Sequence, residues 1–187
     1  MEALAVRIAH FFLQKHYVEP EQVEWFQYGL VRRMMGCITF LLLLPAGAIL
    51  VGWLGSFLYL YTFRFLRTRT GGYHAKTPHG CLLVSLCTML VALILAKFLT
   101  NAFFGVIVLF GSAVCIFVLA PANSAAIHLT TSEIVAIRPR IWIRLASVVL
   151  AGCILLFTYT PLGSCMVVAV SVVAIMLVFA NSGFGAQ

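Results

Sequence analysis

Residues 102–120 read AFFGVIVLFGSAVCIFVLA, and none of these nineteen residues is charged. At a helical rise of about 1.5 Å per residue the run is roughly 28 Å long, close to the roughly 30 Å thickness of the hydrocarbon core of a bilayer. The turn-forming pair Thr100-Asn101 precedes the run and Pro121 follows it. The stretch therefore predicts a helix that crosses a membrane.

The sequence on both sides of this run has the same character. Three further runs of similar length carry at most one charge each: Leu82–Leu99, Ile141–Tyr159 and Ser164–Ala180. The residues Thr160-Pro161-Leu162-Gly163 predict a turn between the last two runs. Each run predicts one further membrane span.

The earlier run Cys37–Phe65 is long for one span and short for two, and Arg64 is its only charge. If this run crossed the membrane once, Arg32 and Arg33 would lie on the opposite side from Arg64. That would contradict the tendency of Lys and Arg to gather on the cytoplasmic side. We therefore expect two spans here, either tilted or partly re-entrant.

Together these runs predict an all-α fold, a polytopic membrane protein with six transmembrane helices and an N-terminal amphipathic helix. Six spans place both termini on one side of the membrane. Eleven of the twelve Lys and Arg residues then lie on the side of the termini, and only Lys97 lies on the other. The positive-inside rule makes the side of the termini cytoplasmic. Three short outer turns and two longer inner loops join the spans.

The N-terminal residues 1–17 are mixed in character. Over residues 3–17, the polar side chains Arg7, His10 and Gln14 share one helical face, and the apolar side chains lie largely away from it. Such a helix can lie in the plane of the membrane interface. We expect an interfacial helix over these residues, within a single integral membrane domain of residues 1–187.

The composition supports a membrane protein. The chain is 63% hydrophobic and 9% charged, whereas a soluble domain is about 25% charged. Its formal net charge is +7, but the basic residues cluster beside apolar runs. We therefore expect the basic residues to bind membrane lipids with anionic headgroups, and we expect no nucleic-acid partner.

Several classes of enzyme are excluded or disfavoured. The chain has no Asp, which excludes an aspartyl intramembrane protease and disfavours a carrier driven by intramembrane carboxylates. No HExxH, GxSxG, P-loop or Cys/His metal spacing occurs, so we expect no metal and no other cofactor. Five of the six cysteines lie in or beside apolar runs, where we expect small buried side chains; the exception is Cys81.

The first inner loop holds the densest group of polar side chains. Residues 64–81 read RFLRTRTGGYHAKTPHGC, with four Arg or Lys, two His, a Gly pair and a Cys. On one unbroken helix, His74 and Cys81 would lie about 10.5 Å apart, too far for direct contact. Thr77 suits a helix N-cap, however, and Pro78 suits the first helical position. We therefore expect a helix to begin there, with the cysteine in its first turns and the histidine in the loop ahead of it.

This arrangement favours a reactive thiol. Near a helix N-terminus and nearby cations, the pKa of a cysteine thiol falls below about 8.5. His74 can accept the thiol proton and remain beside the thiolate as an imidazolium. Gly71 and Gly72 allow the loop to fold back and can present backbone N–H groups to an oxyanion. Arg67 and Arg69 can bind a substrate carboxylate.

Other interpretations stay open from the residues alone. The basic residues can serve only to set the topology. His79 and His128 are rival bases, although His79 would point away from Cys81 on a helix. Glu133 and Asn123 in the second inner loop are candidates for a third catalytic residue. Alternatively, Glu133 is a charge at a helix end and Asn123 is a turn residue. Without them, the predicted catalytic group is a Cys–His dyad.

The pattern of Arg67, the pair Gly71-Gly72, His74 and Cys81 resembles the accessory gene regulator B family of bacterial quorum-sensing peptidases. The chain length, the six expected spans, the basic inner loops and the turn at Ala120-Pro121-Ala122 also fit this family. The resemblance therefore covers essentially the whole chain.

The resemblance implies a membrane cysteine endopeptidase of the bacterial cell membrane. The family cleaves a small peptide precursor, removes its acidic C-terminal segment and holds the upstream part as a thioester. Cys81 would be the nucleophile and His74 the general base and acid. A Cys or Ser of the precursor then attacks the thioester and yields a cyclic thiolactone or lactone. The implied substrate-binding residues are Arg67, Arg69, Gly71 and Gly72. The resemblance also suggests a homodimer.

One departure from the family concerns the second inner loop. The family commonly has lysines between its fourth and fifth spans, whereas residues 121–140 have none and include Ile127-His128-Leu129-Thr130. This difference puts the substrate preference in question. The alternative from another class is a non-enzymatic exporter or scaffold, which would tolerate Cys81→Ala. A third alternative is a membrane acyltransferase, which would also form a thioester but would not act on a peptide.

Overall fold

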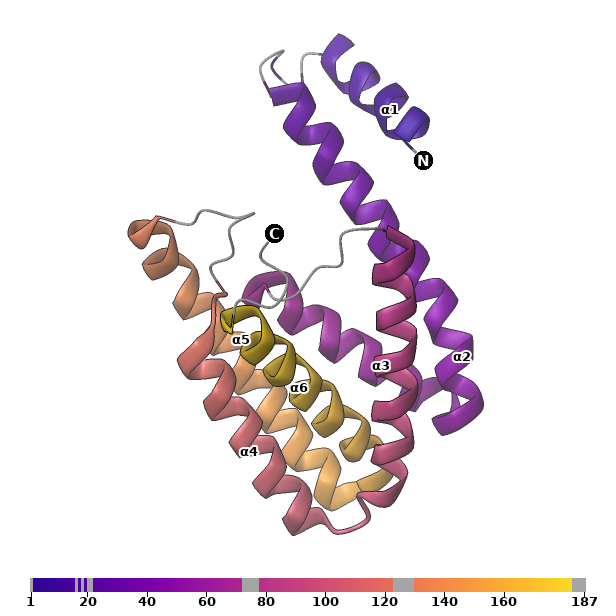
Figure 1. Cartoon of the computed structure of the whole chain (residues 1–187), viewed down its shortest axis with the longest axis vertical. Helices are drawn as coiled ribbons and strands as arrows, with labels where there is room; N and C mark the ends of the chain where they lie inside the picture. Colours follow the sequence, from indigo (N-terminus) through magenta and orange to yellow (C-terminus); the bar gives the residue numbers. More distant parts are fainter. Residues whose placement is uncertain are drawn as a thin grey trace. The chain divides into compact units, whose positions relative to one another are not determined.

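A computed structural model describes residues 2–15, 17, 19, 22–71, 78–122 and 130–182. Within these ranges the chain forms helices and no β-strand, which confirms the all-α prediction for them (Figure 1). The helices are α1 (Glu2–Gln14), α2 (Val23–Thr70), α3 (Pro78–Phe98), α4 (Ala102–Leu119), α5 (Thr131–Thr158) and α6 (Thr160–Asn181).

The chain divides into two compact units, Met1–Leu43 and Leu44–Gln187. In the first unit, α1 packs on the beginning of α2. The ring centroid of Phe12 lies 5.4 Å from that of Phe26, and Ala9 is buried. The expected N-terminal helix therefore forms, although it ends at Gln14. Its position at a membrane interface stays a prediction.

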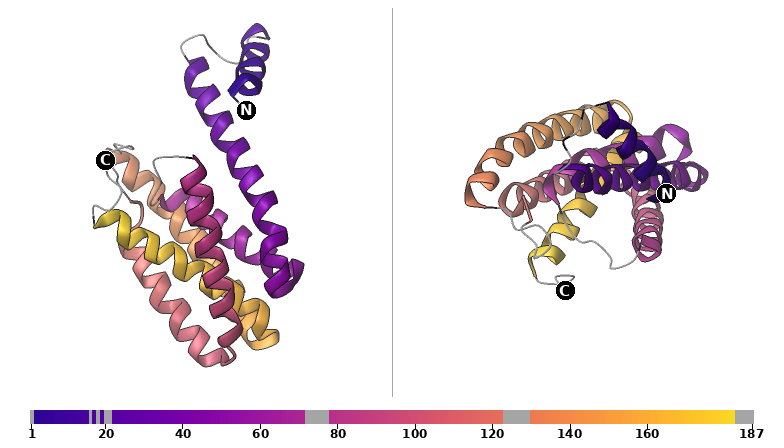
Figure 2. Two further views of the ribbon diagram at one scale, coloured as in Figure 1. Left: turned by 45° about the vertical axis from the view of Figure 1, so that its right-hand side comes forward. Right: turned by 90° about the horizontal axis from the view of Figure 1, so that it is seen from above.

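In the second unit, α6 is the central helix. It contacts α3, α4 and α5, and Figures 1 and 2 show these helices beside it. Fully buried side chains from four helices form the core there, among them Leu66, Ile116, Leu156 and Val167. Gly163 allows the close approach of α6 to α5, because a Cβ at this position would lie 2.6 Å from the backbone nitrogen of Leu156.

The long helix α2 reverses direction at Gly52, whose backbone is not helical (φ 76°, ψ 165°). Beyond this break, the Ser56 hydroxyl donates a hydrogen bond of 2.8 Å to the Leu44 carbonyl. Residues twelve positions apart on a straight helix would be about 18 Å apart. The chain must therefore double back between them, as the ribbon of α2 does in Figure 1. A reversal here is what two spans within the run 37–65 would require.

The structure supports a membrane protein that crosses the bilayer several times. Four helices among the described residues are long and apolar enough to span a membrane: Gly29–Thr70, Ala102–Leu119, Ser132–Thr158 and Thr160–Asn181. The helix Leu82–Phe98 is also apolar but shorter. Of the expected runs, α3 and α4 agree with the predicted third and fourth spans to within a few residues.

Two predicted boundaries are wrong. The fifth helix begins at Thr131, ten residues before the expected Ile141, because Thr130 and Glu133 form a capping box that starts it early. The sixth helix begins at Thr160, so the expected four-residue turn is instead its first turn. Pro161 fits this position because the first residues of a helix need no backbone N–H donor.

Candidate functional site

The start of α3 places Cys81 as the sequence predicted. The helix begins at Pro78, and the backbone of Cys81 lies in its first turn. The expected inner loop of residues 64–81 is shorter than predicted, because α2 continues to Thr70. His74 and Gly72 lie outside the described residues, as does the side chain of Cys81. The Cys–His pair therefore stays a prediction.

Gly71 ends α2 in the conformation that favours glycine. Its φ is +72°, and its N–H donates a 3.2 Å hydrogen bond to the carbonyl of Arg67. This is the bonding of a left-handed helix C-cap, in which a side chain costs about 1–2 kcal/mol. The structure thus gives a reason for the first residue of the Gly pair: it forms the left-handed cap that ends α2.

A backbone hydrogen bond joins the end of α2 to the residues that follow α4. The N–H of Ala122 donates to the carbonyl of Thr70 at 2.9 Å, and both residues are buried. Thr70 and Ala122 are thus the described residues that the structure brings together at this place. The candidates Asn123 and His128 lie outside the described residues.

The two arginines expected to bind substrate differ in their surroundings. Arg67 is half-buried: a guanidinium nitrogen donates to the Met176 sulfur at 3.2 Å, and the guanidinium lies 5.7 Å from the centroid of the Phe63 ring. Arg69, also in the last turn of α2, is exposed. Arg67 thus anchors α2 to α6, and Arg69 is the more accessible cation.

Arg144 has a structural role that sequence reasoning missed. One guanidinium nitrogen of this α5 residue donates to the Phe65 carbonyl at 2.9 Å and to the Thr68 hydroxyl at 3.0 Å. The guanidinium also lies 4.6 Å from the centroid of the Phe65 ring. Arg144 therefore holds the end of α2 against α5. The available signal was its position inside an apolar run, where a charge needs a partner.

The proposed third catalytic residue Glu133 is occupied as a helix cap. Its carboxylate accepts hydrogen bonds from the backbone N–H and the hydroxyl of Thr130, both at 2.8 Å. The alternative role, a charge at a helix end, is thereby confirmed. Among the rival bases, His79 lies in the first turn of α3, and its side chain is outside the described residues.

The remaining cysteines are less buried than expected. Cys165 is buried and Cys115 and Cys153 are half-buried, but Cys37 and Cys87 are exposed. The prediction was wrong for the last two because an apolar helix in a membrane can direct a small apolar side chain toward lipid. In the parts of the chain that the structure describes, no three His, Cys, Asp or Glu side chains form a group that could hold a metal ion.

These features define an all-helical membrane protein with basic and glycine residues at the end of α2 and a cysteine at the start of α3. A comparison with protein families matches residues 5–178 to accessory gene regulator B. The match covers nearly the whole chain, and the protein belongs to the accessory gene regulator B family. Neither the search of curated proteins nor the search of solved structures gave a match. Membership confirms the resemblance and connects the chain with the processing of quorum-sensing peptides.

Proposed function

We propose that this protein is a membrane cysteine endopeptidase that matures a small signal-peptide precursor. Cys81 is the nucleophile and His74 is its general base and acid. The observation that carries the proposal is the start of α3 at Pro78, which supports a thiol at a helix N-terminus. Family membership supports the class of substrate.

The chemistry needs two acyl transfers. His74 takes the proton of the Cys81 thiol, and the thiolate attacks the scissile carbonyl. As the C–N bond breaks, the imidazolium returns the proton to the leaving amine of the C-terminal segment. The upstream peptide is then a thioester on Cys81. A Cys thiol or Ser hydroxyl of the same peptide loses its proton to His74 and attacks the thioester. This closes a thiolactone or lactone ring and releases the enzyme thiol.

The charges around the end of α2 fit a precursor with an acidic C-terminal segment. Arg69 is exposed there and can bind a carboxylate in bidentate fashion. Arg67 is held by Met176, so we propose that it mainly contributes positive potential. Gly71 ends α2 beside these arginines with a positive φ. Ala122 donates a hydrogen bond to Thr70 here, and we propose that the segment after it contributes to substrate preference.

We further propose six spans in a bacterial cell membrane, with both termini in the cytoplasm. The reversal at Gly52 supports two spans within α2. The apolar helix α3 supports a third span, and the three residues between Pro78 and Leu82 include no Lys, Arg, Asp or Glu. A homodimer and lipids with anionic headgroups stay predictions for the partners.

The test is cleavage of the precursor in cells by the variants Cys81→Ala and His74→Ala. We expect at least about a thousandfold loss of cleavage for each, since both residues act as one unit. Cys87→Ala is the matched control for the cysteine, because it removes an exposed thiol from the same helix. His10→Ala, an exposed histidine of α1, is the control for the histidine.

Full processing by Cys81→Ala and His74→Ala at normal protein levels would contradict the peptidase. That result would favour the exporter or scaffold, for which these side chains are dispensable. An equal loss of processing in Cys87→Ala would instead show that substitutions anywhere on α3 impair the protein. That result would also contradict a specific role of Cys81 as the nucleophile.

A further inference from the structure

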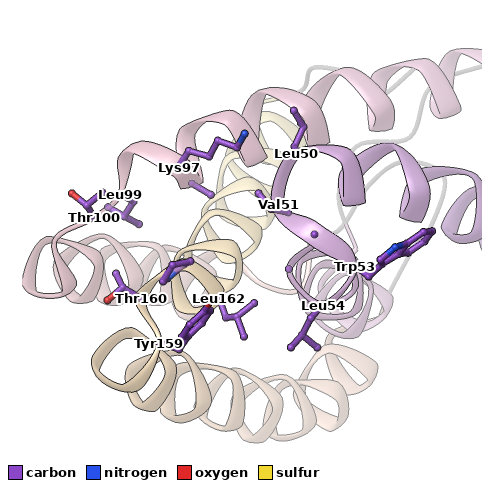
Figure 3. Close-up of a pocket in the computed structure, with 14 residues that line it drawn as sticks. Leu50, Val51, Trp53, Leu54, Lys97, Leu99, Thr100, Tyr159, Thr160 and Leu162 are labelled. Atoms are coloured by element: carbon purple, nitrogen blue, oxygen red, sulfur yellow. The ribbon is translucent and has the colours of Figure 1, made fainter.

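The second unit contains a cavity of about 730 Å³ (Figure 3). Its lining includes the last residues of α3 and the first of α6, whereas Thr70 ends α2 and Cys81 is at the start of α3. The cavity lies between the break of α2 at Gly52, the end of α3 and the junction of α5 with α6. Trp53 and Leu54 line it and are themselves 66% and 58% exposed. The cavity is therefore open at its rim, and its volume is in the range of about 300–1,000 Å³ that small-molecule sites occupy.

The lining is apolar with a few polar groups on one side. Leu50, Leu54 and Leu162 belong to the apolar part. The polar groups are the Lys97 ammonium and three hydroxyls, those of Thr100, Tyr159 and Thr160. Figure 3 shows Lys97 at the rim, with its ammonium directed toward Leu50. The Thr160 hydroxyl donates to the Leu156 carbonyl at 3.0 Å, so its proton is already used within the protein.

No acidic residue lines the cavity to neutralise Lys97. The chain has no Asp and no Glu between Glu24 and Glu133. Glu133 lies in the first turn of α5 and caps that helix, whereas the cavity lies beyond the last turn of α5. Lys97 is also the only Lys or Arg in the sequence between Lys76 and Arg138. An anion that pairs with Lys97 at this site would therefore come from outside the lining.

The position of the cavity indicates what that partner is. Four helices have ends around it or next to it, which is where membrane helices meet the headgroup layer. Trp53 and Tyr159 are the side chains that membrane proteins place at this level. A lysine beside apolar surface extends its ammonium to the headgroups, where phosphates are the anions.

We propose that this cavity binds one anionic phospholipid. Its phosphate lies at the Lys97 ammonium, on the side of the cavity where Thr100 can donate its hydroxyl, and one acyl chain lies along Leu50 and Leu54. A zwitterionic headgroup fits less well, because its own ammonium would find no carboxylate in the lining. The site is distinct from the proposed peptidase site and does not depend on the Cys81 chemistry.

The test is lipid binding to the purified full-length protein in a neutral detergent, measured as bound lipid by native mass spectrometry and as the shift of Tm. Phosphatidylglycerol should bind and raise Tm by a few degrees, and phosphatidylcholine should bind about five- to tenfold more weakly. Lys97→Gln should remove this preference and Lys97→Arg should retain it. Arg138→Gln, which removes an exposed cation at the other end of α5, is the matched control.

A second pair of variants tests the apolar wall. Leu54→Trp should weaken binding of phosphatidylglycerol because the larger ring fills the cavity while Lys97 stays in place. Leu95→Trp is its control, since Leu95 is exposed to a similar degree on α3 but does not line the cavity. Both variants should keep the Tm of the lipid-free protein.

Three results would overturn the proposal. One is equal binding of the two lipids to the unaltered protein. Another is a preference for phosphatidylglycerol that survives Lys97→Gln or falls equally in Arg138→Gln. The third is full stabilisation by glycerol phosphate, which would make the ligand a soluble anion and not a lipid. Loss of peptidase activity is not a readout here, so failure of this site leaves the proposed function untouched.

Discussion

At the scale of single residues, Arg144 shows how a charge near the end of an apolar run can organise the site. It bonds to both Phe65 and Thr68 and stacks on the Phe65 ring. We expect Arg144→Ala to destabilise the protein by about 2 kcal/mol, since hydrogen bonds to a charged group contribute about 1.5–3 kcal/mol. Precursor processing should fall as well, because α2 leads directly to His74. Thermal unfolding in detergent and cleavage in cells measure the two effects.

The control is Arg140→Ala, which removes an exposed arginine one turn earlier on α5. We expect little change in Tm or cleavage for this variant. Arg144→Lys should recover only part of the loss, because an ammonium lacks the planar guanidinium that stacks on the ring. Equal effects at both positions would mean that Arg144 contributes only charge and does not hold α2 in place.

How far the sequence predicted the site also differs from residue to residue. The start of α3 could be predicted because Thr77-Pro78 is a local signal that depends on neighbouring residues only. The contact of Arg144 with Phe65 joins residues 79 positions apart, and no local pattern encodes such a distance. For the same reason, the hydrogen bond of Arg67 to Met176 of α6 could not be predicted, and its role in substrate binding stays a prediction.

At the scale of helices, the C-terminus of α2 depends on Gly71. Gly71→Ala puts a Cβ on a residue with φ +72°, which costs about 1–2 kcal/mol. We expect Tm and precursor cleavage to fall together, because Gly71 ends α2 only three residues before His74 in the sequence. Gly111→Ala is the control: a Cβ there meets no atom within 4 Å. Since glycine costs about 0.5–1 kcal/mol relative to Ala inside a helix, this variant should be neutral or stabilising.

A cleavage rate unchanged in Gly71→Ala, together with an unchanged Tm, would contradict this cap. The glycine would then be replaceable, and the direction of the following segment would have another cause.

Some helix boundaries could be predicted from local sequence, whereas at others the same residues suit two different structures. The turn Thr100-Asn101 was predicted, and Asn101 indeed accepts a hydrogen bond from the backbone N–H of Phe104 as the N-cap of α4. The residues Thr160–Gly163 suit both a turn and a first helical turn, and packing of Gly163 on α5 favours the helix. The residues before Ile141 are polar, so hydropathy alone does not include them in the fifth span. Only the capping box of Thr130 and Glu133 indicates that α5 begins at Thr131.

At the scale of the whole molecule, the account depends on which side of the membrane each helix end faces. The positions of the apolar runs and of the basic residues along the sequence predicted a six-span protein. The structure adds the reversal of α2 at Gly52. The sequence could not supply the arrangement of the helices around α6, because nearly every residue of an apolar run is equally suited to lipid and to protein.

Topology can be measured with single cysteines in a protein whose native cysteines are replaced by Ser. We expect Lys97→Cys to react in intact cells with a membrane-impermeant maleimide, and Arg138→Cys to react only after the cells are opened. These two residues lie at the opposite ends of the predicted spans, and both are exposed. Labelling of both in intact cells, or of neither, would contradict the six-span topology with cytoplasmic termini.

The most direct measurement of the central claim is the intact mass of the purified protein, mixed with its precursor and quenched in acid. We predict a species heavier by the N-terminal part of the precursor, attached to Cys81 and released by hydroxylamine as a thioester would be. The adduct should be absent in Cys81→Ala and unchanged in Cys87→Ala. Cleavage of the precursor without an adduct, or an adduct on a cysteine other than Cys81, would contradict the account.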